Sequence, residues 1–273
     1  MSEHYIHGSS ESERKRLALM NELINQRCLD ALELDEEELV LDVGAGTGQF
    51  TRLMAQQLPH TSSIIAVEQN PDQVQAALQL ADSDSHHGVI DFRIGDAAQL
   101  PLESHELGQI DLAHCRFLLE HVSRPLPVVR AMVAAVRPGG RVVLLDDDHE
   151  LIRFWPEPGG LAAAWTAYYR SYRKLGNDPL IGRKLPSLLH QAGAKPSRIT
   201  QLFYGACAGS PEFQGIVDNL IGVLSGVRQV VLSAGEINAK DYDAALENFA
   251  SFSKLPDAAV WYVINWAEGI VQP

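Results

Sequence analysis

The chain has 273 residues and a formal net charge of −13, with 46% hydrophobic and 21% charged residues. This composition is typical of a globular chain that buries a sizeable core, as one large domain or as one domain plus a lid. Nucleic-acid binders concentrate Lys and Arg on one face, so the acidic balance predicts no nucleic-acid partner. Cys28, Cys115 and Cys207 lie far apart, which suggests neither a zinc site nor a disulfide framework.

The beginning of the chain, Met1 to Tyr5, lacks the basic and apolar segments of a secretory signal. No uninterrupted apolar run approaches the length that spans a bilayer. We therefore expect a cytoplasmic protein that has no membrane partner.

The first predicted element is an amphipathic helix that begins at a capping box, Ser10 to Glu13, and extends to about Leu32. Its apolar face is predicted from the helical spacing of Leu17, Met20, Ile24 and Cys28.

An apolar strand, Leu39 to Val43, then runs into Gly44, Gly46 and Gly48 and on into a helix. Glycines there allow positive φ and a close approach of a ligand to the backbone, which is typical of a nucleotide-type cofactor loop. A dinucleotide fingerprint would carry a glycine where this chain has Gln49, which disfavours a nicotinamide cofactor.

The next strand, Ile64 to Val67, ends at Glu68, an acid suited to a ribose diol because a carboxylate accepts hydrogen bonds from vicinal hydroxyls. Asn70 as N-cap and Pro71 at the first helical position predict the helix that follows. A third apolar run, residues 89–94, precedes Asp96 and Ala97, and a fourth strand, Ile110 to His114, leads into residues 115–121.

The elements follow one another as strand, glycine loop, strand with Glu, strand with Asp and strand, and Arg137 to Arg141 then precede a fifth strand. This series resembles the class I S-adenosylmethionine-dependent methyltransferases over about residues 36–148. The resemblance implies a doubly wound α/β fold, with a seven-stranded, mostly parallel sheet, an antiparallel last strand and helical lid elements. S-adenosylmethionine is the implied cofactor.

The resemblance also implies a set of cofactor-binding residues. It places Gly44, Ala45 and Gly46, with Thr47 and Gly48 beside them, under the methionine and ribose part, and Glu68, followed by Gln69, on the ribose hydroxyls. It places Asp96 and Ala97 at the adenine edge, and His114, Cys115 and Arg116 at the methionine end. Arg116 has an alternative role as an ion-pair partner of Glu120, and Cys115 as a buried apolar group.

Residues 1–35 resemble the N-terminal lid of some small-molecule methyltransferases, in which an aromatic residue, here Tyr5, closes over the cofactor; a frayed tail is the alternative. We assign residues 36–148 to the cofactor-binding core and residues 149–177 to a lid insertion. In that insertion, Trp165, Tyr168, Tyr169 and Tyr172 recur at helical spacing, as a core face or as a cavity wall.

Residues 178–208 are expected to continue the core, with a helix that ends near Gly193 and a sixth strand over Arg198 to Ala206. Residues 209–256 are expected to form a helical insertion, opened by Ser210 as N-cap and Pro211. Residues 257–273 hold the final strand, Ala259 to Trp266, antiparallel beside the sixth.

We therefore predict an S-adenosylmethionine-dependent methyltransferase that acts by in-line SN2 transfer on a small, partly apolar molecule, in a chain that can form a homodimer. His149 and His121 are the candidate general bases, each with an ordinary structural role as the alternative. A nicotinamide-dependent oxidoreductase and a non-catalytic S-adenosylmethionine-binding protein are the alternative functions. We expect no metal, because neighbouring carboxylates in the run Asp146 to Glu150 alternate faces and cannot all converge on one ion.

Overall fold

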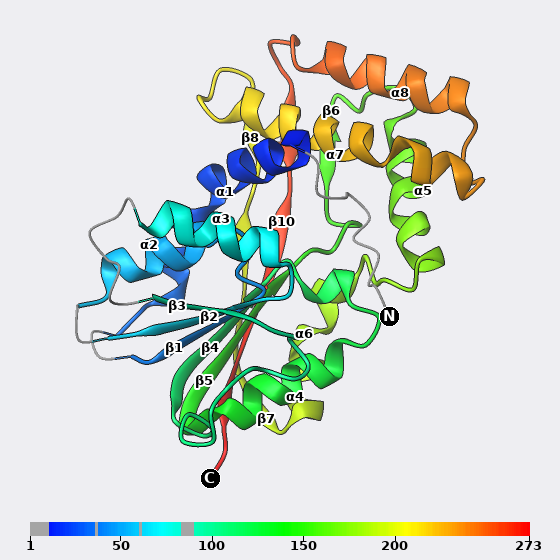
Figure 1. Ribbon diagram of the computed structural model, residues 1–273. Helices are drawn as coiled ribbons and strands as arrows, with labels where there is room; N and C mark the ends of the chain where they lie inside the picture. The colour runs from blue at the N-terminus through cyan, green and yellow to red at the C-terminus, as the bar shows by residue number, and fades with distance from the viewer. Residues whose placement is uncertain (1–10, 36–37, 60–61, 83–89) are drawn as a thin grey trace.

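The computed structural model describes residues 11–35, 38–59, 62–82 and 90–273 (Figure 1). Its main sheet has seven strands in the order β3-β2-β1-β4-β5-β10-β7. The strands β1 to β5 pair in parallel, whereas β10 is antiparallel to both β5 and β7. The predicted doubly wound α/β fold with an antiparallel last strand is confirmed. These strands are β1 (Val40–Val43), β2 (Ile64–Glu68), β3 (Ile90–Ile94), β4 (Ile110–Arg116), β5 (Val136–Asp146), β7 (Ala194–Phe203) and β10 (Val263–Val271).

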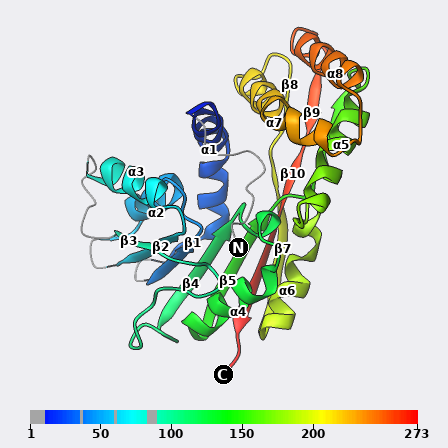
Figure 2. The ribbon, with the colours of Figure 1, turned by 45° about the vertical axis from the view of Figure 1, so that its right-hand side comes forward.

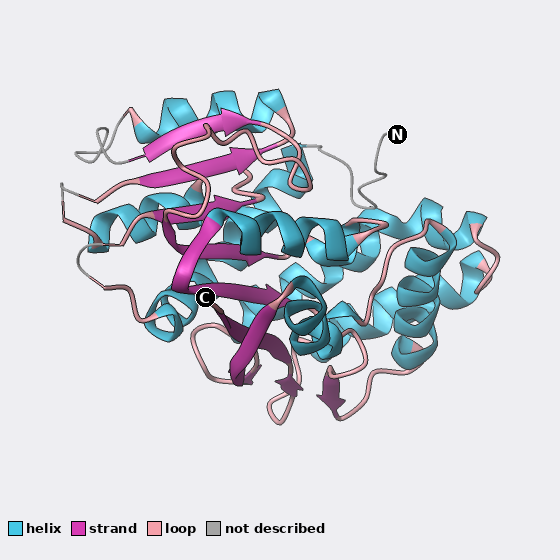
Figure 3. Cartoon of the chain, turned by 90° about the horizontal axis from the view of Figure 1, so that it is seen from below, coloured by secondary structure: helices cyan, strands magenta, loops and turns pink. Residues whose placement is uncertain are grey.

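Helices cover both faces of this sheet, as the view along it shows (Figure 3). One face packs against α4 (Pro125–Ala135) and α6 (Leu185–Ala192), and the other against α1 (Glu11–Leu32) and α2 (Gln49–Gln57). A parallel strand buried on two faces has to be apolar almost throughout, and all four residues of β1 are buried. The helix α3 (Pro71–Ala81) begins as expected, because the Asn70 side chain accepts a hydrogen bond from the Asp72 backbone N–H.

Additional elements interrupt the chain after β5 and between β7 and β10. They form a second sheet, β6 (Arg153–Trp155), β9 (Ala259–Trp261) and β8 (Ala206–Cys207), and the helices α5 (Leu161–Lys174), α7 (Phe213–Ser233) and α8 (Ala239–Phe252). Figures 1 and 2 show α5, α7 and α8 together beyond one end of the main sheet. Because α7 also contacts α1, the N-terminal helix and the insertions meet above the sheet.

Several predicted boundaries were wrong. The fifth strand already begins at Val136, so Arg137 to Arg141 lie within it and do not precede it. The sixth strand of the main sheet begins at Ala194, four residues before the expected start, and ends at Phe203. The final apolar run divides, because residues 259–261 pair with β6 and β8 while the main-sheet strand begins only at Val263. The helix α7 begins at Phe213, since the Ser210 hydroxyl donates to the Cys207 carbonyl instead of capping it.

Among the described residues, α7 is the one helix that is long and apolar enough to cross a membrane by length and composition. Its apolar residues are used inside the fold: Ile216, Val217, Leu220 and Leu224 are buried in the core cluster. The helix contacts α1, α5 and α8. A helix surrounded by other helices is apolar because it belongs to the core.

Candidate active site

A cavity of about 740 Å³ lies where β1, β2, β4 and β5 end, under α1, α5 and α7. This size is suited to a cofactor together with a small molecule. Ten of the predicted site residues line it: Gly44, Ala45, Gly46, Thr47, Glu68, Gln69, His114, Arg116, His121 and His149. Gly48, Asp96, Ala97 and Cys115 are not among its lining residues, and Tyr5 lies outside the described residues.

The glycine loop has the backbone that its sequence predicts, with φ of 80° at Gly44, 58° at Gly46 and 70° at Gly48. A Cβ at Gly48 would lie 2.7 Å from the Phe92 ring. Gly48 therefore allows α2 to pack closely on the sheet, the role that a dinucleotide fingerprint gives to the glycine missing at position 49. A Cβ at Gly46 would meet only the Gln73 side chain, at 3.3 Å, and would project into the cavity.

Glu68 is fixed at the tip of β2 by the backbone around it. One carboxylate oxygen accepts a hydrogen bond from the Gly46 N–H (3.0 Å), and the other from the Asn70 N–H (2.8 Å). These bonds hold the carboxylate against the glycine loop, at the wall of the cavity. A ligand with vicinal hydroxyls would meet an acceptor that is already oriented.

A buried set of hydrogen-bonded polar side chains forms the floor of the cavity below the glycine loop. The Thr51 hydroxyl donates to Asp42 (2.6 Å), and the other oxygen of Asp42 lies 3.1 Å from Nδ1 of His114. The His114 ring also packs against Phe50. Asp42 and His114 are both buried, and these bonds satisfy the Asp42 carboxylate and Nδ1 of His114, whereas Nε2 of His114 has no hydrogen-bond partner among the described residues.

Arg116, at the end of β4, connects the sheet to α1. Its guanidinium donates to the side-chain oxygens of Asn25 (2.8 Å) and Asn21 (2.9 Å) and lies 4.3 Å from the centre of the Phe50 ring. Asn21 in turn donates to Gln49, the first residue of α2. This network holds the cavity-facing side of α1 next to the glycine loop.

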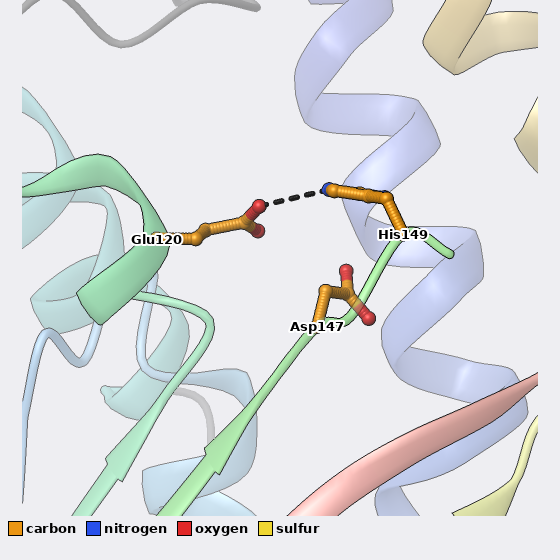
Figure 4. A group of neighbouring side chains, drawn as sticks. All are labelled: Glu120, Asp147 and His149. Atoms are coloured by element: carbon orange, nitrogen blue, oxygen red, sulfur yellow. Dashed lines mark hydrogen bonds and ion pairs between the residues drawn. The ribbon is translucent and has the colours of Figure 1, made fainter. Parts of the chain in front are cut away.

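Glu120, Asp147 and His149 meet at the opposite end of the cavity (Figure 4). Nε2 of His149 lies 3.0 Å from one Glu120 oxygen, and Nε2 of His121 lies 3.4 Å from the other. The Tyr262 hydroxyl donates to Asp147 (2.8 Å). One ligand-type atom from each of Glu120, Asp147 and His149 falls within 4.8 Å of the others, a set that can bind a cation.

The carboxyl groups of the acidic run Asp146 to Glu150 do not converge on one point. Asp146 accepts hydrogen bonds from the Leu119 and Asp147 backbone, and Asp148 pairs with Arg183, so only Asp147 of these three lines the cavity. Glu120, however, reaches Asp147 from another loop. The alternation therefore does not decide the metal question, and the absence of a metal stays a prediction.

Burial and negative charge shift the pKa values of the groups at this end of the cavity. Burial lowers the pKa of His149, although Asp147 and Asp148 act in the opposite direction. Burial and the charges of Glu120 and Asp147 raise the pKa of Asp146 well above its usual range. Burial and the neighbouring Asp147 likewise raise the pKa of the Tyr262 hydroxyl. At neutral pH, His149 is therefore a neutral imidazole in an anionic environment.

The aromatic residues of α5 belong both to the core and to the cavity wall. Trp165, Tyr168 and Tyr172 are buried and line the cavity, whereas Tyr169 does neither. The Trp165 indole donates to the His149 carbonyl (2.9 Å), and the Tyr168 and Tyr172 hydroxyls lie 3.0 Å apart. The aromatic stripe thus positions the His149 loop and closes the cavity.

Several lining residues were not singled out by the sequence as site residues. Glu120 and Asp147 lie in the segments 115–121 and 146–150, each close in sequence to a candidate histidine. That proximity was the signal by which they could have been found. Tyr204 directly follows β7, Asn219 belongs to α7 and Tyr262 lies between β9 and β10, and no local pattern connects them with the glycine loop. Further residues of this kind are Asn21, Phe50, Phe117 and Leu118.

Comparisons with known proteins agree with this fold. Residues 41–144 match the family described as "Methyltransferase domain". An uncharacterized 37.1 kDa protein in transposon TN4556 of Streptomyces fradiae is 27% identical over 82% of this chain and 61% of its own length. The ubiquinone biosynthesis O-methyltransferase of Ralstonia nicotianae is 34% identical over 38% of this chain and 40% of its own length.

The chain thus spans less than two thirds of the length of each of these two relatives. Among solved structures, the YcgJ protein of Bacillus subtilis has a TM-score of 0.58 and 16% identity, covering 91% of this chain and 98% of its own. At this identity the likeness shows a shared fold.

Proposed function

We propose that the chain, whose residues 41–144 match a methyltransferase domain, is a class I S-adenosylmethionine-dependent methyltransferase that transfers a methyl group to a small, partly apolar molecule. The proposal is supported most by one observation: the Glu120–His149 pair lines the same cavity as Gly46 and Glu68. A cofactor loop and a proton acceptor thereby share one enclosed space.

The residues present fit the cofactor. The positive-φ glycines Gly44 and Gly46 leave space beside the backbone for its methionine and ribose part, and Glu68 is oriented to accept from ribose hydroxyls. When bound, S-adenosylmethionine supplies a methyl group on a positively charged sulfur. No phosphate has to be held, which agrees with a loop without Lys or Arg between Gly44 and Gln49.

His149 accepts the proton that the acceptor releases. An ionised carboxylate only accepts hydrogen bonds, so the Nε2 hydrogen of His149 points at Glu120 and Nδ1 keeps its lone pair. Nδ1 has no hydrogen-bond partner among the described residues. Glu120 orients the ring and stabilises the imidazolium that forms, while the α5 aromatics exclude water. His121, on the other side of Glu120, is the second candidate.

Calorimetry and turnover test this function. We expect micromolar binding of S-adenosylhomocysteine and no binding of NADH, with His149→Gln and Glu120→Gln lowering turnover by about 10²–10⁴-fold while S-adenosylhomocysteine affinity is kept. His190→Gln, on the exposed side of α6, is the matched control. Binding of NADH would favour the oxidoreductase alternative, and S-adenosylhomocysteine binding without turnover would favour a binding protein.

A further inference from the structure

The cavity has two chemically different halves. The half next to the glycine loop holds Glu68 and the polar loop backbone. The other half, which we call the acceptor chamber, is bounded by Glu120, Asp147 and His149 and by the aromatic side of α5. Figure 4 shows the three polar side chains of the chamber converging, Glu120 from the short 3-10 helix Leu119–His121 and the other two from the segment after β5.

The acceptor chamber is anionic. Glu120 and Asp147 contribute two carboxyl groups to its lining. Among the described residues that line the whole cavity, Arg116 is the only Lys or Arg, and its guanidinium is bound to Asn21 and Asn25 of α1. Arg183 also binds the acidic run, but it pairs with Asp148 and Glu150, neither of which lines the cavity.

The two carboxyl groups decide which charge of acceptor the chamber favours. Glu120 and Asp147 would repel a phenolate or carboxylate acceptor, whereas they would attract a cation.

Aromatic rings surround these carboxyl groups. Tyr168 lies edge-on to His149 with ring centres 5.2 Å apart and is perpendicular to Tyr172 at the same distance. The ring centres of Trp165 and Tyr168 lie 5.3 Å apart, and the Tyr262 hydroxyl, just before β10, donates to Asp147. Carboxylates within a group of Tyr and Trp rings are the arrangement that binds ammonium ions, because the ring faces are negative and the cation sheds its water there.

We propose that the acceptor is an amine, bound as its ammonium ion in the acceptor chamber and methylated on nitrogen. This inference rests on the proposed methyltransferase function and specifies its substrate class. His149 removes one N–H proton, and the freed nitrogen lone pair forms a bond to the methyl carbon. The bond between that carbon and sulfur breaks with its electrons remaining on sulfur. The products are a methylated ammonium ion and S-adenosylhomocysteine, and His149 returns its proton to water.

The test uses two probes of equal shape, choline and its neutral carbon analogue 3,3-dimethylbutan-1-ol, titrated into the full chain by calorimetry with and without S-adenosylhomocysteine. We expect choline to bind at least about tenfold more tightly than the neutral alcohol. Asp147→Asn should remove that preference by weakening choline and leaving the alcohol unchanged. Glu150→Gln, an exposed change on the same loop, should have no effect.

Equal affinities for the two probes would overturn the amine proposal, as would a choline preference that survives in both Asp147→Asn and Glu120→Gln. Tight Mn²⁺ binding that Glu120→Gln abolishes, without a choline preference, would assign the chamber to a metal ion instead. Circular dichroism shows whether each variant is folded. Because S-adenosylhomocysteine binding is measured separately, its loss would refute the proposed function and not the cation preference.

Discussion

Replacing Gly46 by Ala separates cofactor binding from folding, because Gly108 offers a matched control. Both glycines have positive φ, 58° and 70°, where an L-residue costs about 1–2 kcal/mol. A Cβ at Gly108 would meet nothing within 4 Å, and one at Gly46 only the tip of the Gln73 side chain. Gly46→Ala and Gly108→Ala should therefore lower the free energy of unfolding by similar amounts, about 1–2 kcal/mol each.

Their effects on the cofactor should differ. The new methyl group at Gly46 projects into the cavity, and overfilling a closely packed site costs about 1–3 kcal/mol. Calorimetry should show S-adenosylhomocysteine affinity reduced by about tenfold or more in Gly46→Ala and unchanged in Gly108→Ala. Denaturant unfolding without ligand supplies the stabilities. Normal affinity in Gly46→Ala would refute the placement of the cofactor on this loop.

Three further predictions concern pH, metal and motion. Burial lowers the pKa of His149, so below about pH 6.5 the unfolded chain binds a proton at this residue that the folded chain does not. The free energy of unfolding, measured with denaturant, should therefore fall on acidification, and it should fall less in His149→Gln. Turnover should survive EDTA; loss that Mg²⁺ restores would show that Glu120, Asp147 and His149 bind a metal. Hydrogen exchange in α1 and residues 150–175 should slow when S-adenosylhomocysteine is added, and unchanged exchange would refute a closing lid.

The cofactor half of the fold could be predicted because its signals are local. A buried parallel strand followed by Gly44 and Gly46, and the cap at Asn70, each depend on residues adjacent in sequence. The resulting strand order follows from the recognised motif series. Glu68 was identified for the same reason, since its position at a strand's end is visible in the sequence.

The acceptor chamber was only partly predictable, because its residues meet through tertiary packing. His149 and the α5 aromatics could be named, but the contact between Glu120 and His149 joins loops 29 residues apart in sequence. Tyr262 arrives through the antiparallel return of β10. The break between β9 and β10 was missed because residues 259–264 form one continuous apolar run, and nothing in its composition marks the change of sheet. The domain limits, the homodimer and the cytoplasmic location stay predictions.

The most direct test of the account is transfer of label from methyl-labelled S-adenosylmethionine to a small molecule in a metabolite extract. We predict a labelled product that appears with the unaltered chain and decreases by about 10²-fold or more with His149→Gln. S-adenosylhomocysteine binding together with no labelled small molecule in any extract would contradict the account and leave a chain that only binds the cofactor.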